Sequence, residues 1–145
     1  MNIDSIINGI VIDHIPAGRS MRIYQLLGLD ALDCPVAIIK NAVSEQMGKK
    51  DIIKIDADID VNLDIIGFVA PNATVNLIRD GKLVEKKHMA LPERLVNVIR
   101  CKNPRCITSC EQELDHVFRL CDEEKRVYRC IYCDTVAKSD GSQYL

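Results

Sequence analysis

Four cysteines near the C-terminal end have the residue type and spacing of a metal site. They form two close pairs, Cys101 with Cys106 and Cys130 with Cys133, separated by a 23-residue gap. Each pair can form a small knuckle that presents two sulfurs, and the intervening loop can fold back to bring the pairs together. Two close pairs among seven cysteines argue against four unrelated buried thiols. We therefore predict one structural Zn²⁺ per chain, held by these four residues.

A site of this kind is closed, because four sulfur ligands leave no coordination position for water or substrate. The predicted metal therefore folds a surface and does no chemistry. Iron in a rubredoxin-like site would use the same ligands, so electron transfer is an alternative function. Both rubredoxin pairs normally enclose two residues, however, whereas the first pair here encloses four. Cys110 and Cys121 lie between the pairs, and either could substitute as a ligand.

Composition and charge describe a globular chain with little attraction for nucleic acid. Of its 145 residues, 48% are hydrophobic and 28% are charged. Residues 1–93 hold 10 Lys and Arg against 13 Asp and Glu, whereas residues 94–145 hold 9 against 8. Neither half offers the basic field of a nucleic-acid binder. A nucleic-acid-binding zinc ribbon is nevertheless an alternative function, although residues 94–145 contain few aromatic residues for stacking.

The apolar runs are too short to span a bilayer, so we expect no membrane association. The N-terminus lacks the basic start and apolar stretch of a signal peptide, which favours a cytoplasmic location. In a reducing cytosol, seven cysteines indicate metal ligands and free thiols rather than disulfides.

Strand-like segments recur through the first 90 residues, because β-branched or alternating polar and apolar residues fill them. The expected strands are 9–15, 35–39, 51–55, 74–78 and 82–87. Asp80 and Gly81 separate the last two and predict a tight hairpin turn, in which both central residues need positive φ.

Two helices are expected between these strands. The segment 19–27 has apolar residues at helical spacing, and Gly28 can end it. A second, short helix should run to about residue 70, with Asp58 or Asp60 as its N-cap.

This order predicts an α+β fold with two domains. The pattern β-α-β-β-α-β, followed by an extra hairpin strand, is typical of a ferredoxin-like sandwich with two helices on one face of a mostly antiparallel sheet. We predict this domain at 1–92 and a small all-β, zinc-ribbon-like domain at 93–145. A unit of about 50 residues buries little apolar surface, so a metal cross-link would stabilise it. The polar tail 138–143 is expected to be frayed.

Five segments carry a more specific pattern. They are 9–16 (GIVIDHIP), 47–55 (MGKKDIIKI), 70–76 (APNATVN), 91–94 (LPER) and 130–133 (CIYC). In this order, and with this cysteine spacing, the chain resembles the regulatory chains of aspartate carbamoyltransferase over nearly its whole length. The resemblance implies a non-catalytic regulatory subunit that controls pyrimidine biosynthesis. Its N-terminal domain would bind nucleotides, and its zinc domain would dock on the catalytic chain.

The same resemblance implies a set of ligands and partners. CTP would inhibit, ATP would activate, and UTP could act together with CTP. Regulatory chains would pair with each other through their N-terminal domains and bridge catalytic trimers.

A nucleotide site is also implied by the resemblance. It assigns Lys50 and Lys86 to phosphate, Lys54 to ribose, and the pair Asp13 and His14 to ribose and triphosphate. The positions that match around the base and sugar are Ile6, Val11, Ile52, Asn76, Ile78 and Leu83. From the residues alone, a lone lysine indicates a solvated surface, and each apolar position could equally belong to the core. The even spacing of Lys50 and Lys54 nevertheless puts both on one face of the expected strand.

Overall fold

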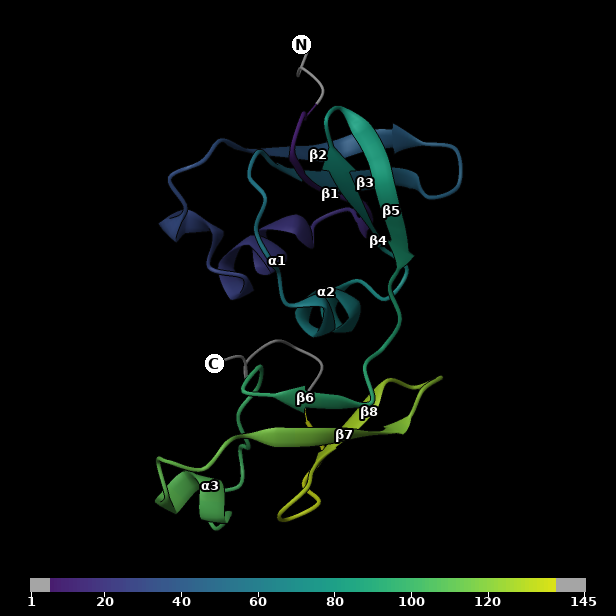
Figure 1. Cartoon of the computed structure of the whole chain (residues 1–145). Helices are drawn as coiled ribbons and strands as arrows, with labels where there is room; N and C mark the ends of the chain where they lie inside the picture. Colours follow the sequence, from purple (N-terminus) through teal and green to yellow (C-terminus); the bar gives the residue numbers. More distant parts are fainter. Residues whose placement is uncertain (1–5, 138–145) are drawn as a thin grey trace. The chain divides into compact units, whose positions relative to one another are not determined.

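Residues 6–137 are described by the computed structural model, and they fold around two separate β-sheets (Figure 1). The chain divides accordingly into two units, Met1–Ala90 and Leu91–Leu145. The polar segment 138–143, expected to be frayed, lies outside the described residues. None of the helices within 6–137 is long and apolar enough to cross a membrane.

The first unit is built on a sheet that has five strands within the described residues. Its elements are β1 (Gly9–Pro16), α1 (Ser20–Leu26), η1 (Leu29–Ala31), β2 (Val36–Ser44), β3 (Gly48–Ile55), α2 (Leu63–Val69), β4 (Thr74–Arg79) and β5 (Lys82–His88). The strand order is β2-β3-β1-β4-β5, and all neighbouring strands are antiparallel. The predicted β-α-β-β-α-β order with an extra hairpin strand is therefore confirmed, and so is the α+β fold class.

The two-residue repeat of the strands separates a helix-covered face from an open face. In β1, Ile10 and Ile12 are buried, whereas Val11 and Asp13 point to the other side and are half-buried. Helices α1 and α2 lie on the first of these faces and pack against each other (Figure 1). Burying each large aliphatic side chain stabilises this arrangement by about 1.5–3 kcal/mol. The core includes Ile10, Ile12, Ile15, Ile23, Leu29, Ile53, Ile55, Ile66, Val69 and Val75.

The second helix starts later than expected and has a different cap. Helix α2 begins directly after Asn62, whose Oδ1 accepts a hydrogen bond from the Asp64 backbone N at 3.0 Å. The prediction of Asp58 or Asp60 as the cap is wrong, because residues 56–62 are not helical and alternate residues from 57 to 63 pack against the core. A capping oxygen must lie two or three residues before the N–H that it accepts.

Strands β2 and β3 are longer than expected, and bulges interrupt β1 and β2. Both β2 and β3 continue through polar residues toward the turn at 45–47, which period-two hydrophobicity alone could not reveal. The pairing register shifts between Ile12 and Ile15 in β1 and between Ile39 and Ala42 in β2. At these bulges His14 and Asn41 adopt positive φ angles of 58° and 60°.

The buried carboxylate of Asp51 links β3 to the start of α1 and to β2. Asp51 is 0% exposed, and its Oδ2 accepts hydrogen bonds from Ser20 Oγ at 2.6 Å and from the backbone N of Gly18 and Ser20. Its Oδ1 accepts a bond from Asn41 N at 3.0 Å. Burial alone would raise the pKa of Asp51, but the bonds from Ser20, Asn41 and Gly18 outweigh it and hold this pKa below its ordinary value.

The second unit has a smaller sheet, with three strands within the described residues. Its elements are β6 (Arg94–Val96), α3 (Ile107–Cys110), β7 (Val117–Asp122) and β8 (Val127–Cys130), and the strand order is β6-β7-β8. Leu95, Phe118 and Tyr128 form its buried centre. The prediction of a small all-β C-terminal unit is confirmed in its three-stranded sheet, to which the short helix α3 is added. Strand β6 lies in a segment for which the sequence suggested only a boundary.

We expect Asp51→Ala to destabilise the first unit by about 3 kcal/mol or more, because it leaves the buried donors of Ser20 and the partly buried N–H groups of Gly18 and Asn41 without an acceptor. The pKa of Asp51 is lower in the folded than in the unfolded state. Its contribution is therefore fully present above the unfolded value, about pH 3.9, and is lost as the pH falls through the folded-state pKa. Urea denaturation followed by circular dichroism, at pH 7 and at pH 3, measures both effects.

Ser20→Ala is the matched control, because it removes a single donor to the same carboxylate and should cost only about 1 kcal/mol. Equal losses in the two variants would contradict the prediction. Asp51→Asn should also have a weaker acid dependence of stability than the wild type, since it lacks the titrating group.

Candidate metal centre and ligand-binding face

The four paired cysteines come from two segments of the second unit. Cys101 and Cys106 lie between β6 and α3, where the Cys106 N donates to the Asn103 carbonyl at 3.0 Å and tightens the first knuckle. Cys130 ends β8, and Cys133 lies in the turn that follows it. The pairing of β7 with β8 carries the second knuckle back toward the first.

The structure brings all four sulfurs together. They lie within 4.8 Å of one another, with Cys101 Sγ at 3.5 Å from Cys133 Sγ and Cys106 Sγ at 3.7 Å from Cys130 Sγ. A tetrahedral Zn²⁺ with bonds of about 2.3 Å separates its sulfur ligands by about 3.8 Å. These distances fit the metal that the sequence predicts, and three of the four cysteines are buried.

Burial in this cluster opposes the thiolate form that a metal needs. It raises the pKa of Cys101 to about 12 and also raises the pKa of Cys130. Burial would likewise raise the pKa of Cys133, but hydrogen bonding to Thr135 outweighs it and brings this pKa to about 6. A divalent cation at the centre would supply the positive charge that keeps all four ligands ionised.

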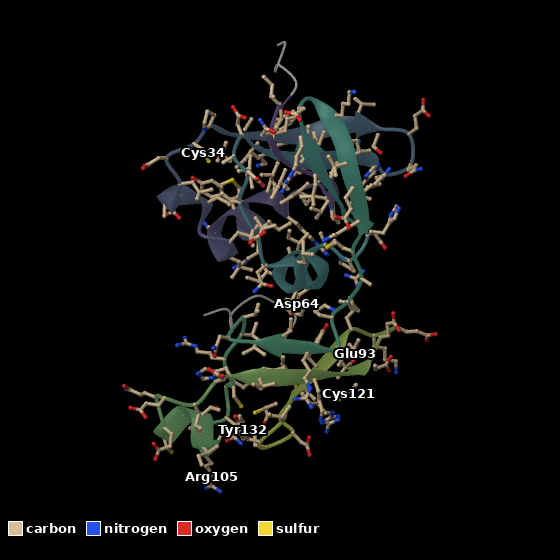
Figure 2. The ribbon with its side chains drawn as sticks, in the orientation of Figure 1. Cys34, Asp64, Glu93, Arg105, Cys121 and Tyr132 are labelled. Carbon is tan, nitrogen blue, oxygen red and sulfur yellow. The ribbon has the colours of Figure 1, made fainter. Side chains whose placement is uncertain are left out.

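The other cysteines lie outside this cluster. Cys110 and Cys121 are exposed, and neither belongs to the group of four sulfurs, so neither substitutes for a ligand. Cys121 lies on β7 (Figure 2). Cys34 is half-buried against the core of the first unit. The metal centre is therefore a structural Cys₄ site, in which a bound Zn²⁺ would cross-link the two knuckles and leave no open position.

A second candidate site is the open face of the larger sheet, opposite the helices. The β-sheet register pairs Val11 with Lys54 on one side and with Asn76 on the other. It also pairs Asn76 with Lys86, so one continuous row crosses β3, β1, β4 and β5. Among the described residues neither lysine of this row forms an ion pair. The row therefore offers two ammonium groups and an amide to an anionic ligand.

Neighbouring positions of the same face form a polar group around the β1 bulge. Lys50 Nζ lies 3.0 Å from Asp13 Oδ1, and the His14 backbone N donates to the same oxygen. Burial opposes ionisation of Asp13, but the bonds from Lys50 and His14 hold its pKa below the ordinary value. His14 Nδ1 lies 3.1 Å from Thr74 Oγ1. These contacts fix Lys50 and His14 beside the row.

The remaining sequence-predicted residues divide between the face and the core. Ile78 pairs with Leu83 on β4 and β5, and Ile52 lies between Lys50 and Lys54 on β3. Ile6 is 8% exposed and packs so close to Gly9 that a Cβ there would lie 2.7 Å from it, which indicates a core position.

Sequence reasoning missed Thr74 and His88, which pair with each other beside Asp13 on the same face. The φ angles of Asp80 and Gly81, 53° and 73°, bear out the predicted turn. Counting back from this turn would pair Thr74 with Lys87, but the register shifts between Leu77 and Ile78 and brings His88 to Thr74 instead, so the hairpin signal alone could not have found His88.

Comparison with known proteins matches both units to described families. Residues 1–90 match the family "Aspartate carbamoyltransferase regulatory chain, allosteric domain", and residues 93–142 match the corresponding "metal binding domain". An aspartate carbamoyltransferase regulatory chain of Bifidobacterium longum is 50% identical over 138 residues, which cover 95% of this chain and 99% of that protein. One of Clostridium acetobutylicum is 49% identical over 138 residues, covering 95% and 94%.

We expect Cys106→Ser to abolish stoichiometric zinc binding and to unfold the second unit, because structural zinc sites contribute on the order of 10 kcal/mol to folding. Zinc content per chain and backbone NMR resonances measure the two effects. Signals of Leu95 and Phe118 should lose their dispersion, while those of Ile12 and Ile53 in the first unit should persist.

The matched control is Cys110→Ser, which replaces an exposed cysteine at the end of α3 and should bind zinc like the wild type. A zinc-free Cys106→Ser chain with an intact second unit would show that the metal does not hold this fold together.

Proposed function

This chain belongs to the family of aspartate carbamoyltransferase regulatory chains, and from that premise we propose that it senses nucleoside triphosphates for a separate catalytic chain. The chain itself is regulatory and not catalytic. CTP, ATP and UTP would bind to the open face of the first unit. The second unit would dock on the catalytic chain in the cytoplasm, and the bound nucleotide would alter the rate of carbamoyl-aspartate formation.

The observation that carries the proposal is the row of Lys54, Val11, Asn76 and Lys86 on the open face. A triphosphate needs several converging cations, and Lys50 adds a third ammonium group next to this row. The apolar Val11 within the row and Ile78 beside it can pack against a base or sugar. Backbone groups of this face could read the base edge, so one pocket could accept both CTP and ATP.

Asp13 holds neighbouring side chains of this face in position. Its carboxylate accepts hydrogen bonds from the Lys50 ammonium and from the His14 backbone N–H, while the His14 ring contacts Thr74 Oγ1, so both side chains are held in place before a ligand arrives. Groups that are fixed beforehand lose less conformational entropy when they bind, which raises affinity. We propose that Lys50 contacts phosphate while Asp13 and His14 face the ribose and triphosphate.

Surfaces on both units are available for assembly. Near the metal cluster, Ile107 and Tyr132 are 49% and 43% exposed, and we propose that they belong to the surface that docks on the catalytic chain. Strand β2 is an edge of the larger sheet, and its Val43 is 90% exposed. An open edge can pair with another strand, which supports pairing of two regulatory chains through their first units.

The connection between the units is short. The Met89 N donates to the Ala73 carbonyl in the first unit, and the Tyr128 hydroxyl donates to the Pro92 carbonyl in the second. Only residues 90 and 91 lie between these anchor points. We propose that this connection carries the regulatory signal, whose coupling free energy is typically about 1–3 kcal/mol.

We expect Lys86→Ala to weaken CTP and ATP binding roughly 10–100-fold, because it removes one charge-assisted bond to the triphosphate. Isothermal titration calorimetry of the purified chain measures the change. Lys87→Ala is the matched control, since Lys87 is the next residue of β5, points to the opposite side of the sheet and lies 3.8 Å from Glu85. Similar affinities of the two variants would argue against a nucleotide on this face.

The regulatory role predicts that this chain co-purifies with an aspartate carbamoyltransferase catalytic chain. Carbamoyl-aspartate formation by the complex, measured with and without CTP, ATP and UTP, should then respond to at least one nucleotide. The Lys86→Ala complex should assemble normally and respond only at higher nucleotide concentration. A complex that is insensitive to all three nucleotides would contradict the proposed function.

A further inference from the structure

Two arginines of the second unit face each other on neighbouring strands. Arg119 of β7 and Arg129 of β8 are direct partners in the antiparallel register. Like charges at directly opposed positions destabilise a sheet unless another group compensates them. Arg119 is also next to Cys121, whose Sγ accepts a bond from Arg119 Nη1 at 3.4 Å.

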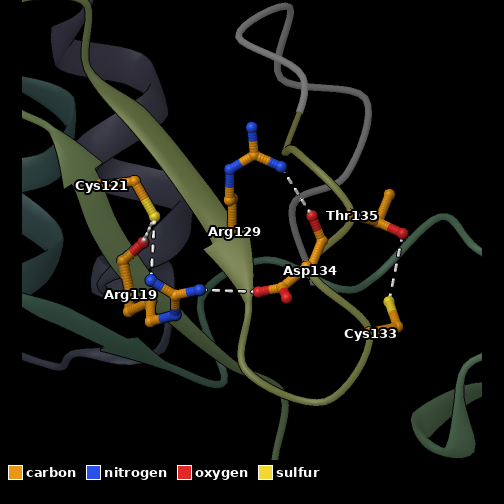
Figure 3. Close-up of polar contacts among 6 residues, drawn as sticks. All are labelled: Arg119, Cys121, Arg129, Cys133, Asp134 and Thr135. Carbon is orange, nitrogen blue, oxygen red and sulfur yellow. Dashed lines mark hydrogen bonds and ion pairs between the residues drawn. The ribbon is translucent and has the colours of Figure 1, made fainter.

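Both guanidinium groups bind the same residue, Asp134 (Figure 3). Arg119 Nη2 donates to Asp134 Oδ1 at 2.7 Å, and Arg129 Nη1 donates to the Asp134 backbone carbonyl at 3.0 Å. One carboxylate and one carbonyl thus compensate the two opposed cations. Asp134 directly follows the ligand Cys133, so this cluster touches the metal site through the chain.

The backbone of Asp134 shapes the second knuckle. Its φ angle is 61°, and its N donates to the Cys130 carbonyl at 2.9 Å, while the Cys130 N donates to the Thr135 carbonyl. This left-handed residue closes the turn that encloses Cys133. As a result, Cys133 Sγ lies 3.5 Å from Cys101 Sγ and 3.1 Å from Thr135 Oγ1.

We propose that Arg119, Arg129 and Asp134 form a clamp that positions the second knuckle for the metal and slows metal release. The inference rests on the Cys₄ metal centre and adds three positioning residues that are not ligands. Groups that orient the ligands of a metal site from outside it commonly affect its affinity.

The expected effect is modest, because Arg119 and Asp134 are 47% and 66% exposed and ion pairs in water are weak. We expect loss of the Arg119–Asp134 bond to accelerate zinc release roughly 3–10-fold at low salt. Salt screens exposed charges, so at about 1 M salt the acceleration should nearly disappear.

The experiment measures zinc release from the zinc-loaded full-length chain to an excess of the chromogenic chelator 4-(2-pyridylazo)resorcinol. Asp134→Asn is the central variant, because Asn tolerates positive φ and retains the backbone carbonyl that binds Arg129. Arg119→Ala should accelerate release by a similar factor. The double variant should be no faster than either single one, since both remove the same bond.

Arg79→Ala is the matched control. It removes a similarly exposed ion pair, Arg79 with Asp58 at 3.4 Å, from the first unit, and should leave zinc release unchanged. Arg119→Lys, which keeps the charge, should restore part of the slow release. The absorption spectrum of the Co²⁺-loaded chain should keep its tetrahedral thiolate bands in every variant, because the ligands themselves remain.

Two results would overturn the clamp. One is a release rate of Arg119→Ala and Asp134→Asn equal to that of the wild type at low salt. The other is an acceleration that is the same at low and at high salt, which would indicate general loosening of the fold. A wild-type chain that holds no zinc at all would instead refute the metal centre, and the clamp with it.

Discussion

Strand β1 is hydrogen-bonded on both sides, to β3 and to β4, and the organisation of the first unit depends on its register. Ile10 and Ile12 must face the helices, because burying them stabilises the fold. Val11 and Asp13 are therefore directed to the open face. A slip of one residue would exchange the two faces and expose the core, so the same force that builds the core also fixes the row of polar groups opposite it.

The two-residue alternation of the strands is interrupted at two bulges, one in β1 and one in β2. The bulges at His14 and Asn41 turn the chain out of the ladder, and Asp51 between them accepts the Asn41 N–H that would otherwise remain without a ladder partner. A buried carboxylate is costly unless it is fully hydrogen-bonded, and four donors meet that requirement here. Asp51 thus stabilises the frame that carries Lys50, its neighbour in sequence, on the open face.

The second unit has a different source of stability from the first. Its buried centre of Leu95, Phe118 and Tyr128 is small, and the four sulfurs form a second, chemically distinct centre next to this sheet. A metal can hold two knuckles rigidly where few apolar side chains are available. Such a rigid frame suits a docking surface, whereas the larger sheet supplies the open face for a ligand. The two units are therefore stabilised differently: an apolar core stabilises the first, and a metal centre would stabilise the second.

Local patterns in the sequence determined the elements and the metal ligands. The cysteine spacing indicated the four ligands, period-two segments indicated the strands, and Asp80-Gly81 indicated the hairpin, because each of these signals lies within a few neighbouring residues. The sequence did not predict the helix cap at Asn62 or strand β6. The extended apolar segment before Asn62 and the three-residue strand both depend on packing against residues that are distant in sequence. Only the tertiary structure decided that Lys54, Asn76 and Lys86 share one row and that Arg119 and Arg129 meet at Asp134. Such sets come from strands that are distant in sequence, and their register is fixed by the core as a whole.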